Sequence, residues 1–205
     1  MKLHQQRKPM RLAEYDYFLP GAYFVTVCTK NRGLLFQSPE MRLAVESAWH
    51  SVKDVFANID LDEFVVMSNH SHGVVWITGE GAYRLHPGTG QNDGAGRDRQ
   101  LHVPTVPTPE NNPKSETLSN IIGAFKTTAA TRINKLRGTM GVSVWQRSFY
   151  DRIIRNDYEL ERIRVYIRNN PIKWEEDRDN PMGVNFGRPA KSIDDYWNEI
   201  FDLHV

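Results

Sequence analysis

Two apolar runs joined by only two polar residues place the strongest constraint on the fold of this chain. The runs are "DEFVVM" (62–67) and "HSHGVVWIT" (70–78), and Ser68 and Asn69 lie between them. A two-residue polar connection between apolar runs is typical of a β-hairpin. The sequence therefore predicts that the two runs pair as antiparallel strands, the second of which begins at His70.

The rest of the chain alternates between the residue periods of strands and helices. Val25 and Val27 alternate with Phe24 and Thr26 in a first strand, whereas apolar residues recur every three or four positions in three other segments. The predicted elements are a strand within 21–33, a helix over 39–58, the hairpin, a helix over 117–138, a strand-like segment over 142–156, and a helix that starts at Asn156 or Asp157 and stops before Pro171.

This order of elements predicts an α+β fold with a ferredoxin-like antiparallel sheet and packed helices. The 205 residues, 40% of them hydrophobic, suffice for one sizeable core. We expect one domain over 1–173 that contains a long loop at 79–115, where six glycines and five prolines occur in 37 residues. Residues 174–205 hold three Lys or Arg against eight acids and are predicted to form an acidic C-terminal tail.

Composition favours an intracellular protein. The chain has one cysteine, Cys28, inside the apolar run "AYFVTVCT", which predicts a buried thiol rather than a disulfide. No stretch approaches the roughly eighteen apolar residues of a membrane-spanning helix, and the N-terminal residues lack the apolar segment of a signal peptide. We expect a cytoplasmic protein with no membrane partner.

Positive charge is concentrated in the second half of the chain. Residues 117–173 hold eleven Lys or Arg against four acids. Such a segment could neutralise phosphates of a nucleic acid, and a solvated helix face would explain the same charges equally well. The candidate DNA-binding residues are Lys126, Arg132, Lys135, Arg147, Arg152, Arg162 and Arg168.

His70 and His72 are one residue apart at the start of the third predicted strand. Because side chains alternate along a strand, both imidazoles face the same way, together with Val74 and Trp76. Two imidazoles side by side could bind a metal ion, although an isolated H-x-H more often consists of ordinary hydrogen-bonded histidines. A second feature is needed to choose between the two interpretations.

The last predicted helix supplies that feature. Tyr166 and Asn170 are four residues apart, so they are neighbours on one helical face beside the apolar stripe. Each alone has an ordinary structural interpretation, as a residue at the edge of the core and as a helix terminus. Together with His70 and His72 they form a recognisable set.

With these residues the sequence resembles the single-tyrosine transposases of the HUH endonuclease superfamily, and within them the REP-associated tyrosine transposases of bacteria. The resemblance runs through "YFVTVCTKNR", "FVVMSNHSHGVVWI", "LSNIIGAFKTTAATRINK", "VWQRSFYDRIIRN" and "YELERIRVYIRNNPIKW". It departs at Ser71, where the family usually has a large hydrophobic residue, and in the length of the loop over 79–115. Since Ser71 faces the opposite side of the strand, we expect it to alter packing more than metal binding.

The resemblance implies a metal-dependent endonuclease and strand transferase that acts on single-stranded or hairpin DNA. It implies that His70, His72 and Asn170 bind Mg²⁺ or Mn²⁺ and that Tyr166 is the nucleophile, forming a 5′-phosphotyrosine link. It also implies a bacterial protein that associates with the nucleoid when bound to DNA, and it allows both a monomer and a homodimer.

Two other functions and one other nucleophile remain open. The chain could be a non-catalytic protein that binds structured DNA, or a metal-dependent phosphodiesterase that activates water. Tyr150, which lies in the strand-like segment near Arg147 and Arg152, is the rival nucleophile. Trp145 and Phe149 could stack on unpaired bases or belong to the core.

Overall fold

The computed structural model describes residues 19–78, 117–177 and 180–186. Within these ranges, four strands and three α-helices follow one another in the order β1-α1-β2-β3-α2-β4-α3. Short 3₁₀ helices follow β1, α1 and α3. The elements are β1 (Gly21–Cys28), η1 (Lys30–Arg32), α1 (Pro39–His50), η2 (Ser51–Asp54), β2 (Ile59–Val66), β3 (His70–Ile77), α2 (Leu118–Arg137), β4 (Tyr150–Ile154), α3 (Asp157–Asn169) and η3 (Trp174–Glu176).

The four strands form one antiparallel sheet in the order β2-β3-β1-β4. With a helix between β1 and β2 and another between β3 and β4, this is the ferredoxin-like arrangement. The predicted fold class is therefore confirmed. The predicted hairpin is also present, because β2 pairs with β3 across the turn at Ser68 and Asn69.

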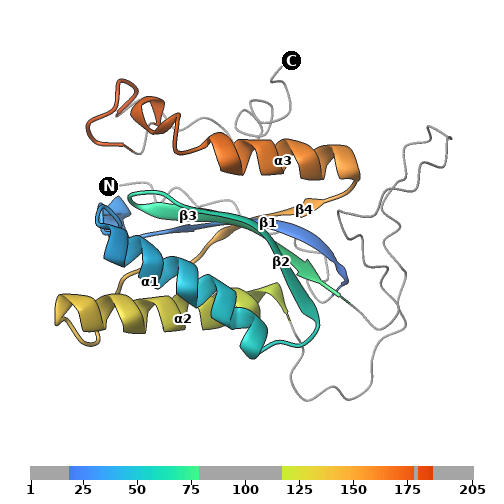
Figure 1. Cartoon of the computed structure of the whole chain (residues 1–205), viewed down its shortest axis with the longest axis horizontal. Coiled ribbons are helices and arrows are strands. Elements are labelled where there is room, and N and C mark those ends of the chain that lie inside the picture. The colour runs from blue at the N-terminus through green and yellow to red at the C-terminus, as the bar shows by residue number, and fades with distance from the viewer. Residues whose placement is uncertain (1–18, 79–116, 178–179, 187–205) are drawn as a thin grey trace, which may run out of the picture.

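Helices cover both faces of the sheet. Figure 1 shows α1 and α2 side by side on one face and α3 on the other. The larger core lies under α1 and α2 and includes Tyr23, Val25 and Val27 of β1. The smaller core lies under α3 and includes Phe24 from the alternate positions of the same strand. The predicted alternation along β1 thus supplies both cores.

Two helix ends follow from local capping. The Thr117 hydroxyl accepts from the backbone N–H of Asn120 at 3.0 Å, and α2 ends at Gly138, whose φ of 64° suits a left-handed C-cap. At the start of α3, the Asn156 side chain accepts from the backbone N–H of Glu159 at 2.8 Å. Both helices begin and end within a residue or two of their predicted bounds.

Three predicted bounds were wrong. The first helix ends at His50 and not at residue 58, because the chain continues as the 3₁₀ helix η2. In this conformation Val52 is buried and Val55 is 68% exposed. The strand β2 begins at Ile59 rather than at 62, since its first residues alternate with acids and a register shift separates Leu61 from Phe64. Only Tyr150–Ile154 of the segment over 142–156 is a strand.

The predicted loop at 79–115 and most of the predicted acidic tail lie outside the described residues. In the part of the chain that the structure describes, no helix combines the length and the apolar character needed to cross a membrane.

Candidate functional site

His70 and His72 lie side by side on the face of the sheet that α3 covers. Both side chains are buried, each with 3% exposure, and their ring centroids are 4.6 Å apart. Val74, further along β3, belongs to the small core on the same face. Ser71 points to the other face, where it is also buried. The side chains of β3 therefore alternate between the two faces of the sheet as predicted.

The ring of His72 is held on three sides. It stacks on Phe24 with centroids 5.4 Å apart, and its Nδ1 lies 2.8 Å from Oγ1 of Thr26, the residue paired with it on β1. Its Nε2 faces the hydroxyl oxygen of Tyr166 at 3.4 Å. His70 in turn has its Nδ1 2.7 Å from Oδ1 of Asn69. Each histidine thus has a polar partner at Nδ1.

Tyr166 reaches the histidines from α3. Its half-buried ring packs edge-on against Phe24 and against His72, with centroid distances of 6.1 and 5.3 Å. Asn170 lies one turn further along, at the end of α3, and is 7% exposed. Four residues beyond it, Trp174 places its ring centroid 6.1 Å from that of His70. The last turn of α3 and the residues after it therefore border the histidine pair.

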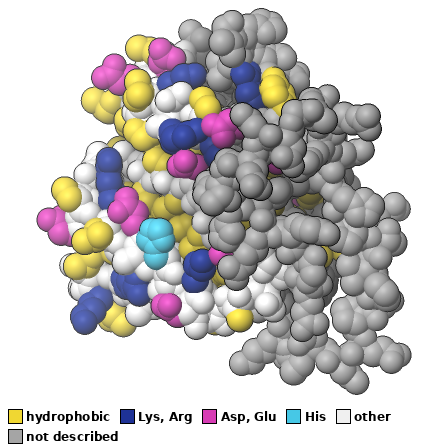
Figure 2. Space-filling model, turned by 45° about the vertical axis from the view of Figure 1, so that its right-hand side comes forward, with side chains coloured by type: hydrophobic (Ala, Val, Ile, Leu, Met, Phe, Trp, Pro, Cys, Tyr) yellow, Lys and Arg dark blue, Asp and Glu magenta, His cyan; other side chains and the backbone are white. Residues whose placement is uncertain are grey.

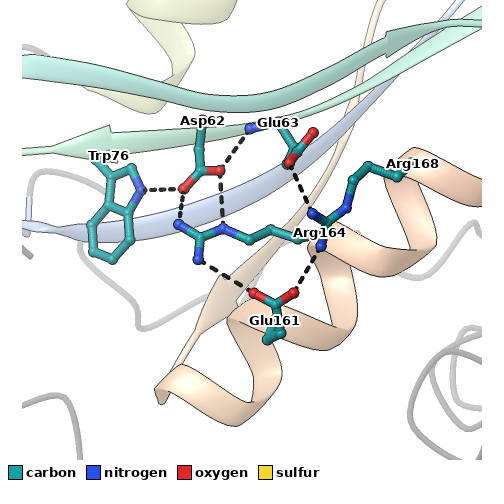
Figure 3. A network of polar contacts seen from close by, with 6 residues as sticks. All are labelled: Asp62, Glu63, Trp76, Glu161, Arg164 and Arg168. Carbon is teal, nitrogen blue, oxygen red and sulfur yellow. Dashed lines mark hydrogen bonds and ion pairs between the residues drawn. The ribbon is translucent and has the colours of Figure 1, made fainter. Parts of the chain in front are cut away.

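A network of ion pairs attaches α3 to the edge strand β2. Figure 3 shows the guanidinium of Arg164 against the carboxylate of Asp62, with Nε 3.0 Å from Oδ1. The indole of Trp76 donates to the same carboxylate at 3.3 Å. Arg168 adds ion pairs to Glu161 at 2.7 Å and to Glu63 at 3.7 Å. Because Arg164 and Arg168 flank Tyr166, this network fixes the helix that carries the phenol.

Asp62 and Arg164 were not among the residues predicted from the sequence. They are 102 residues apart, and no local spacing connects them. Burial alone raises the pKa of Asp62, but hydrogen bonds from Arg164, from the Glu63 N–H and from Trp76, together with the charge of Arg164, outweigh it and leave that pKa below its usual value. The carboxylate is consequently ionised and paired at neutral pH.

Both histidines are electrically neutral in this environment. Burial, followed by the positive charge of Arg32, lowers the pKa of His70 to about 3. Burial, followed by the charges of His70 and Arg32, lowers the pKa of His72 well below its usual value. A neutral imidazole keeps a lone pair on one nitrogen, which is the form that binds a metal ion.

The donor set fits a divalent metal ion with two nitrogen ligands and an amide. Among the described residues there is no group of three or more His, Cys, Asp or Glu side chains placed to hold a metal. Asn170, which is buried at the end of α3 and follows Tyr166 by four residues, is the amide that the family resemblance implied as a third ligand. An amide carbonyl suits Mg²⁺ or Mn²⁺, whereas imidazole ligands suit Zn, Cu, Fe or Ni, so the two histidines do not by themselves select the metal.

The candidate DNA-binding residues lie on both layers. Lys126, Arg132 and Lys135 belong to α2, on the side of the sheet away from the histidines. Lys126 is half-buried and donates to the backbone carbonyls of Gln146 and Arg147 at 2.6 and 3.1 Å, so it holds the segment before β4. Arg132 donates to Oγ of Ser47 on α1 at 2.7 Å. Lys126 and Arg132 thus support the α1 and α2 layer, and all three residues belong to the helix on the other face from the histidine pair.

The other candidates lie nearer to α3 or on it. Arg152 pairs with Glu159 at 3.3 Å, and the guanidinium of Arg162 lies 5.8 Å from the ring centroid of Tyr158. Arg147 is exposed in the segment before β4. Lys and Arg side chains alternate with Asp and Glu over the described surface in Figure 2. On that face the positive charge is interspersed and does not form a continuous patch.

Three aromatic residues of the segment before and within β4 occupy different environments. Trp145 is 6% exposed in the larger core, and Phe149 packs against that core. Tyr150 is 38% exposed and pairs with Thr26 at the edge of the sheet, on the face of the histidines. Of the two tyrosines considered as nucleophiles, Tyr166 is the one in contact with His72.

A protein of Haemophilus influenzae is 31% identical to this chain over 180 residues, which cover 84% of the chain and 92% of that protein. This chain and the Haemophilus protein belong to one family. The Haemophilus relative is described only as an uncharacterized protein, so the family relation brings no activity with it. No protein-family model matches the chain.

Two solved structures show a partial similarity to this chain. One is a REP-associated tyrosine transposase bound to a REP hairpin, with 19% identity and a TM-score of 0.48 over 79% of this chain and 74% of that one. The other is a candidate transposase of Deinococcus radiodurans, with 15% identity and a TM-score of 0.41 over 78% of this chain and 95% of that one. Neither likeness is close enough to assign an activity, and the fold rests on the strand order.

Proposed function

We propose that this chain is a metal-dependent tyrosine transposase that cuts and rejoins single-stranded, hairpin-associated DNA. The observation that carries the proposal is the position of the Tyr166 phenol, whose oxygen lies 3.4 Å from Nε2 of His72. The ring centroid of His70 lies 4.6 Å from that of His72. The sequence resemblance to REP-associated tyrosine transposases supports the same assignment. Binding alone would not require a phenol packed against one of two adjacent, buried imidazoles.

The reaction is a displacement at phosphorus by Tyr166. The phenol oxygen forms a bond to phosphorus and loses its proton, the bond from phosphorus to the 3′ oxygen breaks, and that oxygen takes up a proton. The products are a 5′-phosphotyrosine link and a free 3′-hydroxyl. Because the link conserves the phosphodiester energy, a second 3′-hydroxyl can attack it and reseal the strand.

The metal ion would be held by His70, His72 and Asn170. When bound, a divalent ion polarises the scissile phosphate and offsets the charge that develops in the displacement. The burial of both histidines keeps their rings neutral. Thr26 contacts Nδ1 of His72, and Asn69 contacts Nδ1 of His70. In this orientation Nε2 of His72 faces the hydroxyl of Tyr166.

The chain also positions the nucleophile. Phe24 contacts both His72 and Tyr166, and the Asp62–Arg164 pair fixes α3 two residues before the phenol. A phenol with an ordinary pKa of about 10 is mostly protonated at neutral pH, so correct placement and a nearby cation are both needed for attack. A single strand is the expected substrate because its backbone is accessible to a tyrosine on a fixed helix.

The proposal is tested with 5′- and 3′-labelled hairpin oligonucleotides, incubated with the protein in Mn²⁺ or in EDTA. We expect a protein–DNA adduct that survives denaturation, requires Mn²⁺, disappears in Tyr166→Phe and persists in the matched control Tyr150→Phe. Binding without an adduct would favour a non-catalytic DNA-binding protein. Cleavage without an adduct would favour a phosphodiesterase that activates water.

A further inference from the structure

Asn69 is a fully buried polar residue in the turn between β2 and β3, directly before His70. Two hydrogen bonds of its side chain have opposite polarity. Nδ2 donates to the backbone carbonyl of Arg32 at 3.3 Å, and Oδ1 lies 2.7 Å from Nδ1 of His70. Since a carbonyl can only accept, the contact with Arg32 fixes which end of the amide faces the histidine.

The orientation of this amide determines the tautomer of His70. An amide oxygen accepts and cannot donate, so Nδ1 of His70 must carry the ring proton. In a neutral imidazole with its proton on Nδ1, the lone pair is on Nε2. His72 is different, because its Nδ1 faces the Thr26 hydroxyl at 2.8 Å, and a hydroxyl can either donate or accept. Of these two histidines, His70 is the one whose partner at Nδ1 sets the tautomer.

The surrounding backbone holds Asn69 in place. The carbonyl oxygen of Asn69 accepts from both the backbone N–H and the hydroxyl of Thr29, each at 2.9 Å. The carbonyl that orients its side chain belongs to η1, where Asn31 and Arg32 both have a φ of 56°. Left-handed backbone at two successive non-glycine residues is uncommon and persists where the surrounding structure requires it. Here it accompanies the turn that presents the Arg32 carbonyl to Asn69.

We infer that Asn69 is a positioning residue of the candidate metal site, which sets the tautomer of His70 and so keeps Nε2 available as a ligand. This role rests on the proposed function, which supplies the metal ion at His70. It adds to that function the residue that contacts the ligand His70 from behind. Asn69 acts through His70 and not on the substrate. Loss of a hydrogen-bonding partner behind a ligand typically weakens metal binding about 10- to 100-fold.

The tautomer is measured first, on the full metal-free chain labelled with ¹⁵N at histidine. NMR correlations from the ring nitrogens to the ring protons distinguish a protonated nitrogen from one with a lone pair. We expect His70 to carry its proton on Nδ1. A proton on Nε2 of His70 in the wild-type chain would overturn the inference without any substitution.

The role in binding is measured by calorimetric titration with Mn²⁺. We expect Asn69→Ala to bind Mn²⁺ about 10- to 100-fold more weakly than wild type. Asn69→Asp keeps an acceptor next to Nδ1 but loses the donor to the Arg32 carbonyl, so it should recover only part of the affinity. Circular dichroism of each variant identifies any loss of fold. Equal Mn²⁺ affinity in wild type and Asn69→Ala would overturn the positioning role alone. A wild-type chain that binds no Mn²⁺ would overturn the proposed function, and the role of Asn69 at a metal with it.

Discussion

The phenol oxygen of Tyr166 lies 3.4 Å from Nε2 of His72, although 94 residues separate the two in the chain. The contact joins the helix α3 to the inner strand β3 across the smaller core. Phe24 of β1 touches both rings and completes an aromatic cluster of three strand and helix residues. The proposed attack by Tyr166 depends on this cluster keeping its geometry.

The attachment of α3 to β2 should contribute measurably to stability. Asp62→Asn removes the charge that pairs with Arg164, and both side chains are at most 17% exposed. We expect the free energy of unfolding in urea to fall by about 2 kcal/mol. The matched control is Lys53→Met, which breaks an ion pair to Asp60 between side chains exposed by 49% and 41% and should cost less than about 1 kcal/mol. Equal losses in the two variants would contradict the network.

Close packing beside the histidines should make Gly73 intolerant of a side chain. A Cβ at this position would lie 2.8 Å from Cδ2 of Phe64 and 2.8 Å from Cζ2 of Trp49. Gly73→Ala should therefore lower the free energy of unfolding by about 1–3 kcal/mol. Gly123→Ala is the control, because an added Cβ on α2 meets nothing within 4 Å and should stabilise the helix by up to about 1 kcal/mol. Thermal unfolding of both variants checks the opposite signs.

The polar residue in the middle of the histidine motif should be replaceable. Ser71 is buried, and its hydroxyl oxygen has no hydrogen-bond partner among the described residues. Ser71→Ala removes this oxygen, so we expect a gain of about 1 kcal/mol in the free energy of unfolding. Because Ser71 faces away from His70 and His72, adduct formation should not change. A loss of stability in urea would show that the hydroxyl has a role that packing does not explain.

Acid should destabilise the metal-free protein through its histidines. Unfolded histidines take up protons below about pH 6.5, whereas folded His70 stays neutral until near pH 3, so stability present above pH 6.5 is lost as the pH falls. Each such histidine costs about 2 kcal/mol between pH 7 and pH 5. In EDTA, urea unfolding at the two pH values should show a smaller acid loss for His70→Gln than for wild type. The same loss in both would contradict the burial of a neutral ring.

Much of the architecture could be predicted from the sequence because it depends on local patterns. The two-residue turn before His70 predicted the hairpin, and alternation predicted that His70 and His72 share a face. The capping residues Asn156 and Gly138 marked the bounds of two helices. In contrast, η2 could not be predicted, because Val52 and Val55 continue the helical period while only Val52 is buried.

The site was only partly visible in the sequence because its remaining contacts are long-range. Tyr166 and Asn170 were identified by spacing and family resemblance, but their approach to β3 depends on how α3 crosses the sheet. Asp62 has no sequence feature that points to Arg164. Asn69 was interpreted as a turn residue, and only the three-dimensional structure places its amide between Arg32 and His70.

The most direct test of the proposed chemistry is to identify the residue that carries the DNA. The adduct formed with hairpin DNA is digested with a nuclease and with trypsin, and the nucleotide-bearing peptide is sequenced by mass spectrometry. Tyr166 falls in the tryptic peptide "VYIR" (165–168) and Tyr150 in "SFYDR" (148–152), so the two are distinguishable. We predict nucleotide on Tyr166 in the first peptide. Nucleotide on the second peptide, or on no peptide, would contradict the assignment of Tyr166 as nucleophile.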